Sequence, residues 1–199
     1  MNIICGPLPE VICVDGIDYP IHTDFRNWIK ITLIFEKNGN QINPDMLTDI
    51  FKCCFKTDNT GKAILPSTLQ KTIGGIIAFH CGNVTYKGNN KNSNSIRHRA
   101  FDFEYDSNLL YAAFLAQYGI DLEQIEYLHW WKFKALFDGL NDQHKLSEVI
   151  KCRRTDLAKV KNKEQRKYIR QMQSAYRIPD YRSDEDRDAD FTGVISSIV

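Results

Sequence analysis

The segment SNLLYAAFLAQYG, residues 107–119, decides the fold class. Asp106 or Ser107 offers the side-chain acceptor that begins a helix, and Gly119 is the residue type that commonly ends one. Apolar side chains between them recur every three to four residues, which is helical spacing. They form a bulky face of Leu110, Phe114 and Tyr118 and a small-residue face of Leu109, Ala112, Ala113 and Ala116. A helix that is apolar on two sides is predicted to lie between neighbours.

The next segment, DLEQIEYLHWWKFKALFDG at residues 121–139, predicts a central helix from Asp121 to about Asp138, ended by Gly139. One stripe would hold Leu122, Ile125, His129, Phe133 and Leu136, with Leu128, Trp131 and Ala135 opposite. His129 and Trp131 are interpreted as core residues. Since Trp130 and Trp131 point in different directions on a helix, at least one of them is expected near the surface.

Most of the remaining chain also carries helical signals. Asn43-Pro44 is an N-cap followed by proline at the first helical position, and Ser67 is expected to cap a later helix. Their predicted apolar stripes are Met46, Ile50 and Cys54, and then Leu69, Ile73, Ile76, Ile77 and His80. Gly74-Gly75 inside the second helix indicates close packing or a kink. Further helices are predicted from Ser147 to about Val160 and from Lys163 to Arg177.

Near the N-terminus the pattern changes to a hairpin. Val11–Val14 is β-prone, Asp15-Gly16 is a turn dipeptide, and the chain returns through Ile17–His22. Pro20 restricts the second strand to an edge position. We therefore predict a mainly α protein, a helical bundle with a small N-terminal β-hairpin.

Two segments are ambiguous between helix, strand and loop. Phe25, Trp28, Ile29 and Thr32 share a helical face after a cap at Thr23 or Asp24, but Ile31–Phe35 is β-branched enough for a strand. Phe101–Asp106 alternates aromatic and acidic residues, which suits a strand or a docking segment.

Composition shifts divide the chain into four parts. Residues 1–81 form a hairpin with helices, and the polar residues 82–100 are interpreted as a flexible linker. Residues 101–179 form the helical C-terminal part, and residues 180–199 are an acidic tail.

The overall numbers favour a soluble globular protein. Twenty-six basic and 25 acidic residues give a net charge of +1, and 43% of the 199 residues are hydrophobic. Neither general nucleic-acid binding nor membrane-surface binding is expected from this balance. No apolar run reaches the roughly 18 residues of a membrane helix, and no signal peptide is evident, so an intracellular protein is expected.

The sequence predicts no catalytic, metal or cofactor site. The six cysteines lack a C-x-x-C pair, and G-x-S-x-G and phosphate-loop motifs are missing. Asp102, Glu104 and Asp106 resemble the start of a calcium loop without its glycine and distal glutamate. A non-enzymatic binding protein is the expectation, because no nucleophile, base and orienting residue can be assembled.

Charge clusters instead near the C-terminus. Lys151–Arg177 holds ten basic and two acidic residues, a local charge of +8. It suits a solvated helical face, an acidic protein partner or nucleic acid, although the acidic tail would compete with nucleic acid. The candidate partner-binding residues are Trp130, Arg153, Arg154, Arg166 and Arg170.

Several short blocks resemble a siphophage family of Gram-positive bacteria named for phage protein Gp fifteen. The likeness is densest in Leu128-His129-Trp130-Trp131-Lys132-Phe133 and extends over about residues 8–180. Further blocks are Tyr19-Pro20-Ile21, Thr23-Asp24-Phe25-Arg26, Asp102-Phe103-Glu104, Tyr111-Ala112-Ala113-Phe114, Gln117-Tyr118-Gly119-Ile120-Asp121-Leu122, Arg153-Arg154 and Lys163-Glu164-Gln165-Arg166.

The resemblance implies a role in tail assembly. Members are usually encoded between the major tail protein and the tape measure protein, which implies a chaperone that binds the tape measure protein. Such a protein would act in the host bacterial cytoplasm, with the major tail protein as a further candidate partner. It would form a homo-oligomer and would be missing from the mature virion. The alternatives are a structural tail component and a nucleic-acid-binding regulator that uses residues 151–177.

Overall fold

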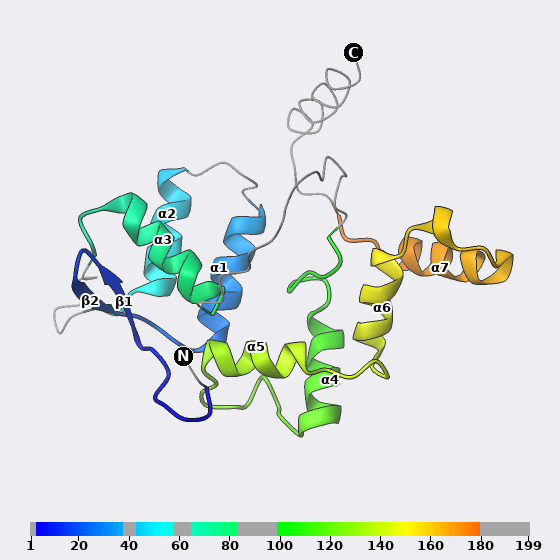
Figure 1. Ribbon diagram of the computed structural model, residues 1–199, viewed down its shortest axis with the longest axis horizontal. Coiled ribbons are helices and arrows are strands. Elements are labelled where there is room, and N and C mark those ends of the chain that lie inside the picture. Colours follow the sequence, from blue (N-terminus) through cyan, green and yellow to red (C-terminus); the bar gives the residue numbers. More distant parts are fainter. Residues whose placement is uncertain (1–2, 38–42, 58–64, 83–98, 180–199) are drawn as a thin grey trace, which may run out of the picture. The chain divides into compact units, whose positions relative to one another are not determined.

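A computed structural model describes residues 3–37, 43–57, 65–82 and 99–179. The chain divides into two compact units (Figure 1). Unit 1 comprises residues 1–89 and 126–136, and unit 2 comprises residues 90–125 and 137–199. The sequence placed residues 126–136 with the C-terminal part, whereas the structure places them with the N-terminal residues. The linker and tail expected at 82–100 and 180–199 lie almost wholly outside the described residues.

The predicted fold class is confirmed, since the described residues are mainly helical with one antiparallel hairpin. Unit 1 contains β1 (Val11–Val14), β2 (Ile17–Pro20), α1 (Phe25–Lys37), α2 (Pro44–Cys54) and α3 (Leu69–His80). Unit 2 contains α4 (Ser107–Tyr118), α6 (Lys145–Arg154), the 3₁₀ turn η1 (Leu157–Lys159) and α7 (Lys163–Ala175). Helix α5 (Trp130–Asp138) begins in unit 1 and ends in unit 2. Within the described residues, none of the helices combines the length and apolar character needed to span a bilayer.

The N-terminal hairpin forms as predicted. Asp15 and Gly16 have φ angles of 54° and 79°, which suits the two-residue turn that matches strand twist. The alternative of a strand at residues 31–35 is wrong, because α1 runs through that segment and buries Phe25, Trp28 and Ile31.

Two helices in unit 1 test the capping and stripe predictions. In α2, the Asn43 side chain accepts the Met46 N–H at 2.8 Å, and the predicted stripe of Met46, Ile50 and Cys54 is buried. Helix α3 instead follows Thr68, without a side-chain cap, and buries Thr72, Ile76 and Phe79. The predicted stripe of α3 was therefore partly wrong, as Leu69 and Ile77 are each 48% exposed.

Packing of α3 against β1 explains this rotation. A Cβ on Gly75 would overlap Cγ2 of Ile12, so the glycine lets the helix approach the strand closely. The close-packing interpretation of Gly74-Gly75 holds at Gly75 alone, because a Cβ on Gly74 would meet nothing within 4 Å.

The predicted start of α5 at Asp121 is wrong. The Asp121 carboxylate accepts the N–H groups of Glu123 and Gln124, which forms a local turn instead of a helix. In unit 1, residues 128–130 run antiparallel to residues 23–25, with Phe25 N–H donating to Leu128 O at 2.9 Å and Trp130 N–H donating to Thr23 O at 2.7 Å. These bonds hold the chain extended at His129, so α5 begins only at Trp130.

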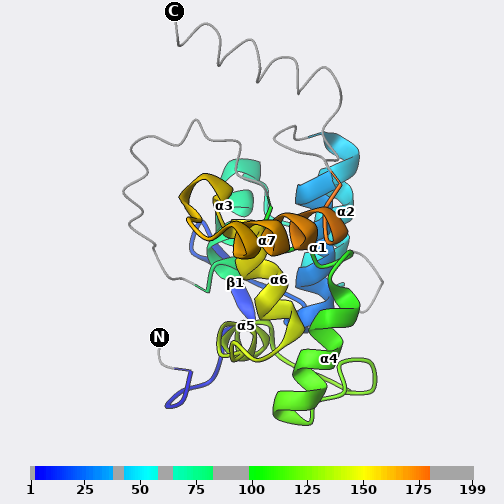
Figure 2. The same cartoon turned by 90° about the vertical axis from the view of Figure 1, so that its right-hand side faces the viewer.

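Unit 2 is a helical unit in which α7 lies across α6 (Figure 2). Helix α4 ends at Gly119 in the left-handed conformation, as predicted, but its buried residues are Leu110, Ala113 and Phe114. The small-residue face was only partly correct, since Ala112 and Ala116 are exposed. Phe101–Asp106 forms turns and no strand, and the helix predicted from Ser147 to Val160 is divided into α6 and η1.

Candidate partner-binding surface

A buried ion pair organises unit 2. The Arg153 guanidinium donates to both carboxylate oxygens of Asp106 at 2.6 and 2.9 Å, and the two side chains are 7% and 1% exposed. Arg153 also donates to Ala100 O and to Tyr176 O, at 3.1 and 2.7 Å. The arginine thereby joins the start of α4 to the residue that follows α7.

The neighbouring carboxylate of Asp102 is equally structural. Its Oδ1 atom accepts the N–H groups of Glu104 and Tyr105 at 2.7 and 3.0 Å, and its Oδ2 atom lies 2.8 Å from the Arg99 guanidinium. Asp102 is 1% exposed, and its own N–H donates to Asp106. These acidic residues therefore shape the turn before α4, and the described residues contain no cluster that could hold a metal ion.

Helices α6 and α7 share a small apolar core. It consists of Val149, Cys152, Ile169 and Met172, all buried. The Asn162 side chain caps α7 by accepting the N–H groups of Glu164 and Gln165 at 2.9 and 3.0 Å. Opposite this core, α7 is free to present charged side chains.

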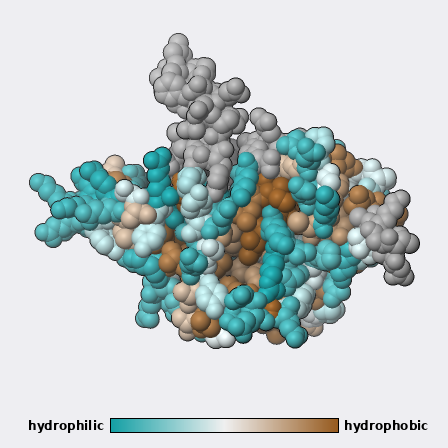
Figure 3. Space-filling model, turned by 180° about the vertical axis from the view of Figure 1, so that it is seen from behind, coloured by the Kyte–Doolittle hydropathy of each residue, from teal (hydrophilic) through white to brown (hydrophobic). Residues whose placement is uncertain are grey.

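The exposed face of α7 carries a stripe of cations, which we call the α7 basic ridge: Lys163, Lys167 and Arg170. Their spacing of four and three residues places them on one side of the helix. All three are exposed, and the structure pairs none of them with a described acidic residue. In Figure 3 the surface of unit 2 over α6 and α7, at the left, is mostly hydrophilic. The ridge thus offers three positive charges to an external partner.

Beside α7, in contrast to the ridge, the charged side chain of Glu148 already has partners. The Tyr168 hydroxyl and the Lys145 ammonium both donate to the Glu148 carboxylate. The Lys145 ammonium first, and then the Tyr168 hydroxyl, hold the pKa of Glu148 below its usual value. This carboxylate is already occupied by Lys145 and Tyr168, so it does not compensate the charge of the ridge.

Comparison with known proteins identifies the chain at the level of a family. The family model described as Bacteriophage Gp15 protein matches residues 5–178. The chain belongs to this family. It is therefore a bacteriophage protein, and the resemblance inferred from the sequence is confirmed. The searches of curated proteins and of solved structures returned no match.

The block that carries the family resemblance most densely lies in unit 1, and all of its residues except Lys132 are buried. Trp130 is 2% exposed and its indole N–H donates to His80 O at 3.0 Å, and the Trp131 indole N–H donates to Phe79 O at 2.8 Å. His129, 3% exposed, bonds Pro9 O through Nε2 and accepts the Trp131 N–H at Nδ1. Burial lowers the pKa of His129, which favours its neutral form. The core interpretation of His129 and Trp131 is confirmed.

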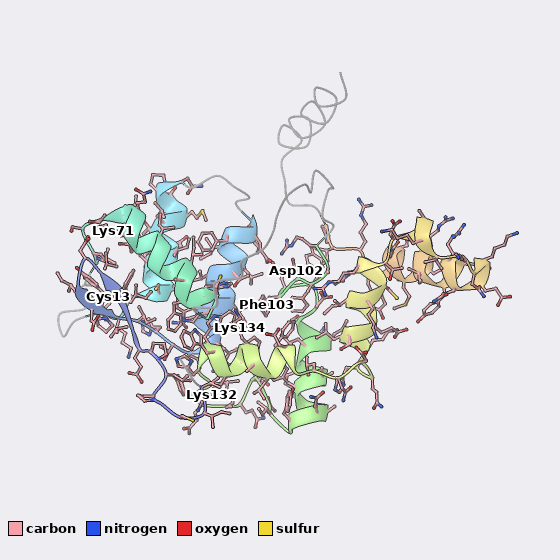
Figure 4. The ribbon with its side chains drawn as sticks, viewed as in Figure 1. Cys13, Lys71, Asp102, Phe103, Lys132 and Lys134 are labelled. Atoms are coloured by element: carbon pink, nitrogen blue, oxygen red, sulfur yellow. The ribbon has the colours of Figure 1, made fainter. Side chains whose placement is uncertain are left out.

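The expectation of an exposed tryptophan in this block is wrong. Trp130 stacks on Phe133 at 5.7 Å between ring centroids and packs beside Trp28 at 6.4 Å. Of the two lysines of α5 labelled in Figure 4, Lys134 donates to His80 O, whereas Lys132 is exposed. In this conformation Trp130 is unavailable to a partner.

The proposed arginines divide into two groups. Arg153 is committed to the buried pair, and Arg166 is half-buried and bonds Val160 O. Arg154 and Arg170 are exposed. Sequence reasoning did not single out Lys163 and Lys167, although their spacing relative to Arg170 was the available signal.

Proposed function

We propose that this member of the Gp15 family is a non-enzymatic tail assembly protein that binds the tape measure protein. The supporting structural observation is the α7 basic ridge, whose exposed cations have no acidic partner among the described residues. The partner is inferred from the family resemblance, whose members are usually encoded beside the tape measure protein. On this proposal the protein acts in the host cytoplasm and leaves before the virion matures.

The roles of the buried polar groups agree with a binding protein. Asp102 and Asp106 bond backbone N–H groups and arginines, and His129 bonds backbone groups at both nitrogens. The hydrogen bonds of these side chains hold the structure together and occupy the groups that acid–base chemistry would need. A tape measure segment with acidic side chains is the partner that the ridge would attract.

Co-expression with the tape measure protein encoded beside it tests the proposal. Size-exclusion chromatography is expected to show a soluble complex with the wild-type chain. The triple variant K163E/K167E/R170E is expected not to form this complex. Unit 1 supplies a matched control of three exposed lysines, reversed as K30E, K52E and K132E. The control variant is expected to keep the complex, because its lysines lie away from the ridge sequence.

The outcomes discriminate between the alternatives. A tape measure protein that stays insoluble beside a well-folded wild-type chain would overturn the proposal. Binding of RNA or DNA that weakens steeply with salt and disappears in the ridge variant would favour a nucleic-acid-binding regulator instead. Detection of the chain in purified virions would favour a structural tail component.

A further inference from the structure

The two edges of the N-terminal hairpin differ in their backbone hydrogen bonding. A two-residue turn at Asp15-Gly16 makes Val14 and Ile17 a hydrogen-bonded pair, and such pairs alternate along an antiparallel ladder. The Ile21 N–H bond to Glu10 O at 3.0 Å confirms this alternation at the far end. The N–H and C=O groups of Val11 and Cys13 therefore point outward, away from β2.

Among the described residues, the outward groups of β1 have no backbone hydrogen-bond partner outside the hairpin. No hydrogen bond joins Val11 or Cys13 to another described segment. The edge of β2 is covered at its Pro20 end by contrast, because Lys56 N–H donates to Pro20 O at 3.1 Å and Ile21 bridges Phe55. Within the described residues, β1 therefore leaves the backbone groups of both of its outward residues without a bond, whereas β2 leaves only those of Asp18.

Edge strands usually carry features that prevent pairing with another chain, such as charges or proline. Strand β2 has both, in Asp18 and Pro20. Strand β1 consists of Val11, Ile12, Cys13 and Val14, with no charge and no proline, and Val11 and Cys13 are exposed. Figure 4 labels Cys13 on this strand. Strand β1, which has neither a charge nor a proline, therefore lies at the edge where the outward backbone groups are unbonded.

The helix beside this edge leaves room for a neighbour. Helix α3 lies beside β1 (Figure 1) and packs on it through Gly75. The Lys71 side chain of this helix bonds Asp15 at the hairpin turn. Next to these positions Gly74 and Ala78 are exposed and small. The one long side chain on this helix face is that of Lys71, and it is held at the hairpin turn by Asp15.

We propose that β1 pairs antiparallel with β1 of a second copy of this chain, giving a four-stranded sheet across a two-fold axis at Ile12. In this register Val11 faces Cys13 of the second copy, and the two-fold axis generates a second, equivalent pair. Within each pair, the outward N–H of one residue donates to the outward C=O of the other. An antiparallel edge is complementary to itself, because a two-fold axis places each donor against an acceptor. A second copy therefore satisfies the edge without further sequence requirements, and this inference stands independently of the proposed function.

Proline at Cys13 provides a selective test. Because the Cys13 N–H points outward, C13P removes an edge donor and leaves the hairpin ladder intact. Light scattering on the full chain across a concentration series should show a dimer whose dissociation constant rises at least tenfold in C13P, since two hydrogen bonds are lost per dimer. C13S, which keeps the N–H, should behave as wild type.

A second perturbation guards against misfolding of C13P. V11K adds a charge to the β1 edge, and I17K adds the same charge to an exposed residue of β2. V11K should dissociate the dimer and I17K should not. A chain that is monomeric at every concentration, or whose dimer survives V11K and C13P in folded form, would overturn the proposal.

Cross-linking checks the register. V11C should form a disulfide between its new thiol and native Cys13 of the second copy, seen as a dimer on a non-reducing gel. The combined variant V11C/C13S should not cross-link, because the axis separates the two new thiols. Equal cross-linking of both variants would contradict the Val11–Cys13 register.

Discussion

Replacement of Arg153 by methionine should destabilise unit 2 more than any change on its surface. The variant leaves the Asp106 carboxylate, 1% exposed, without its guanidinium, and it removes the donors to Ala100 O and Tyr176 O. Removal of one partner from a buried ion pair costs about 3–5 kcal/mol, because the remaining charge is uncompensated. That loss is a large fraction of the 5–15 kcal/mol that stabilises a typical domain.

Urea unfolding measured by two probes resolves the effect. All three tryptophans, Trp28, Trp130 and Trp131, lie in unit 1, so their fluorescence reports on that unit, whereas far-UV circular dichroism reports on both. R153M should lower the urea midpoint measured by circular dichroism. The midpoint measured by tryptophan fluorescence should change less, because unit 1 does not contain the ion pair. R154M is the matched control, since the adjacent arginine is exposed, and it should change stability by less than about 0.5 kcal/mol.

A double-mutant cycle sharpens the result. Adding D106N to R153M removes the uncompensated charge while an oxygen remains to accept the Asp102 N–H. The double variant should therefore be less destabilised than the sum of the single variants, by about 1–3 kcal/mol. A loss below about 1 kcal/mol for R153M, or an equal loss for R154M, would refute the role given to this pair.

Three further predictions concern single positions. Gly75→Ala should destabilise unit 1 by about 1–3 kcal/mol through overlap with Ile12, whereas Gly74→Ala should stabilise it by up to about 1 kcal/mol; thermal unfolding of the two variants must give opposite signs. Burial lowers the pKa of His80 to about 4, so the unfolded chain binds an extra proton between about pH 6.5 and pH 4, and stability should fall by about 3 kcal/mol as the pH drops through this window. His80→Gln should flatten that dependence, and an unchanged profile would contradict it. Asn162→Ala should cost about 1 kcal/mol by uncapping α7, measurable as a lower urea midpoint, while an unchanged midpoint would show that the cap contributes nothing.

Local signals in the sequence predicted the elements that depend on local chemistry. The hairpin turn at Asp15-Gly16, the cap at Asn43 and the helix end at Gly119 all formed where the residues indicated. Each depends on the conformational preference of one or two residues, so no information about distant partners was needed.

The failures occurred where a distant segment competed with a local pattern. Residues 122–128 have helical spacing, but backbone bonds from Thr23 and Phe25 hold the following residues extended. The stripe of α3 was displaced because Gly75 turned toward Ile12. For the candidate site, the sequence located the basic segment but not the burial of Arg153, because its partner Asp106 lies 47 residues earlier.

The position of the His-Trp-Trp block changes how the family resemblance should be interpreted. Its side chains bond backbone carbonyls of Pro9, Phe79 and His80, so the block joins the N-terminal segment, α3 and α5 within unit 1. Residues with this role are constrained by packing, whatever partner the protein binds. The block therefore has a structural role in unit 1, and its buried aromatic side chains are not available to a partner in this conformation. The α7 basic ridge and the β1 edge are the surfaces that we propose for partner recognition, and each can be altered without disturbing the buried residues of the block.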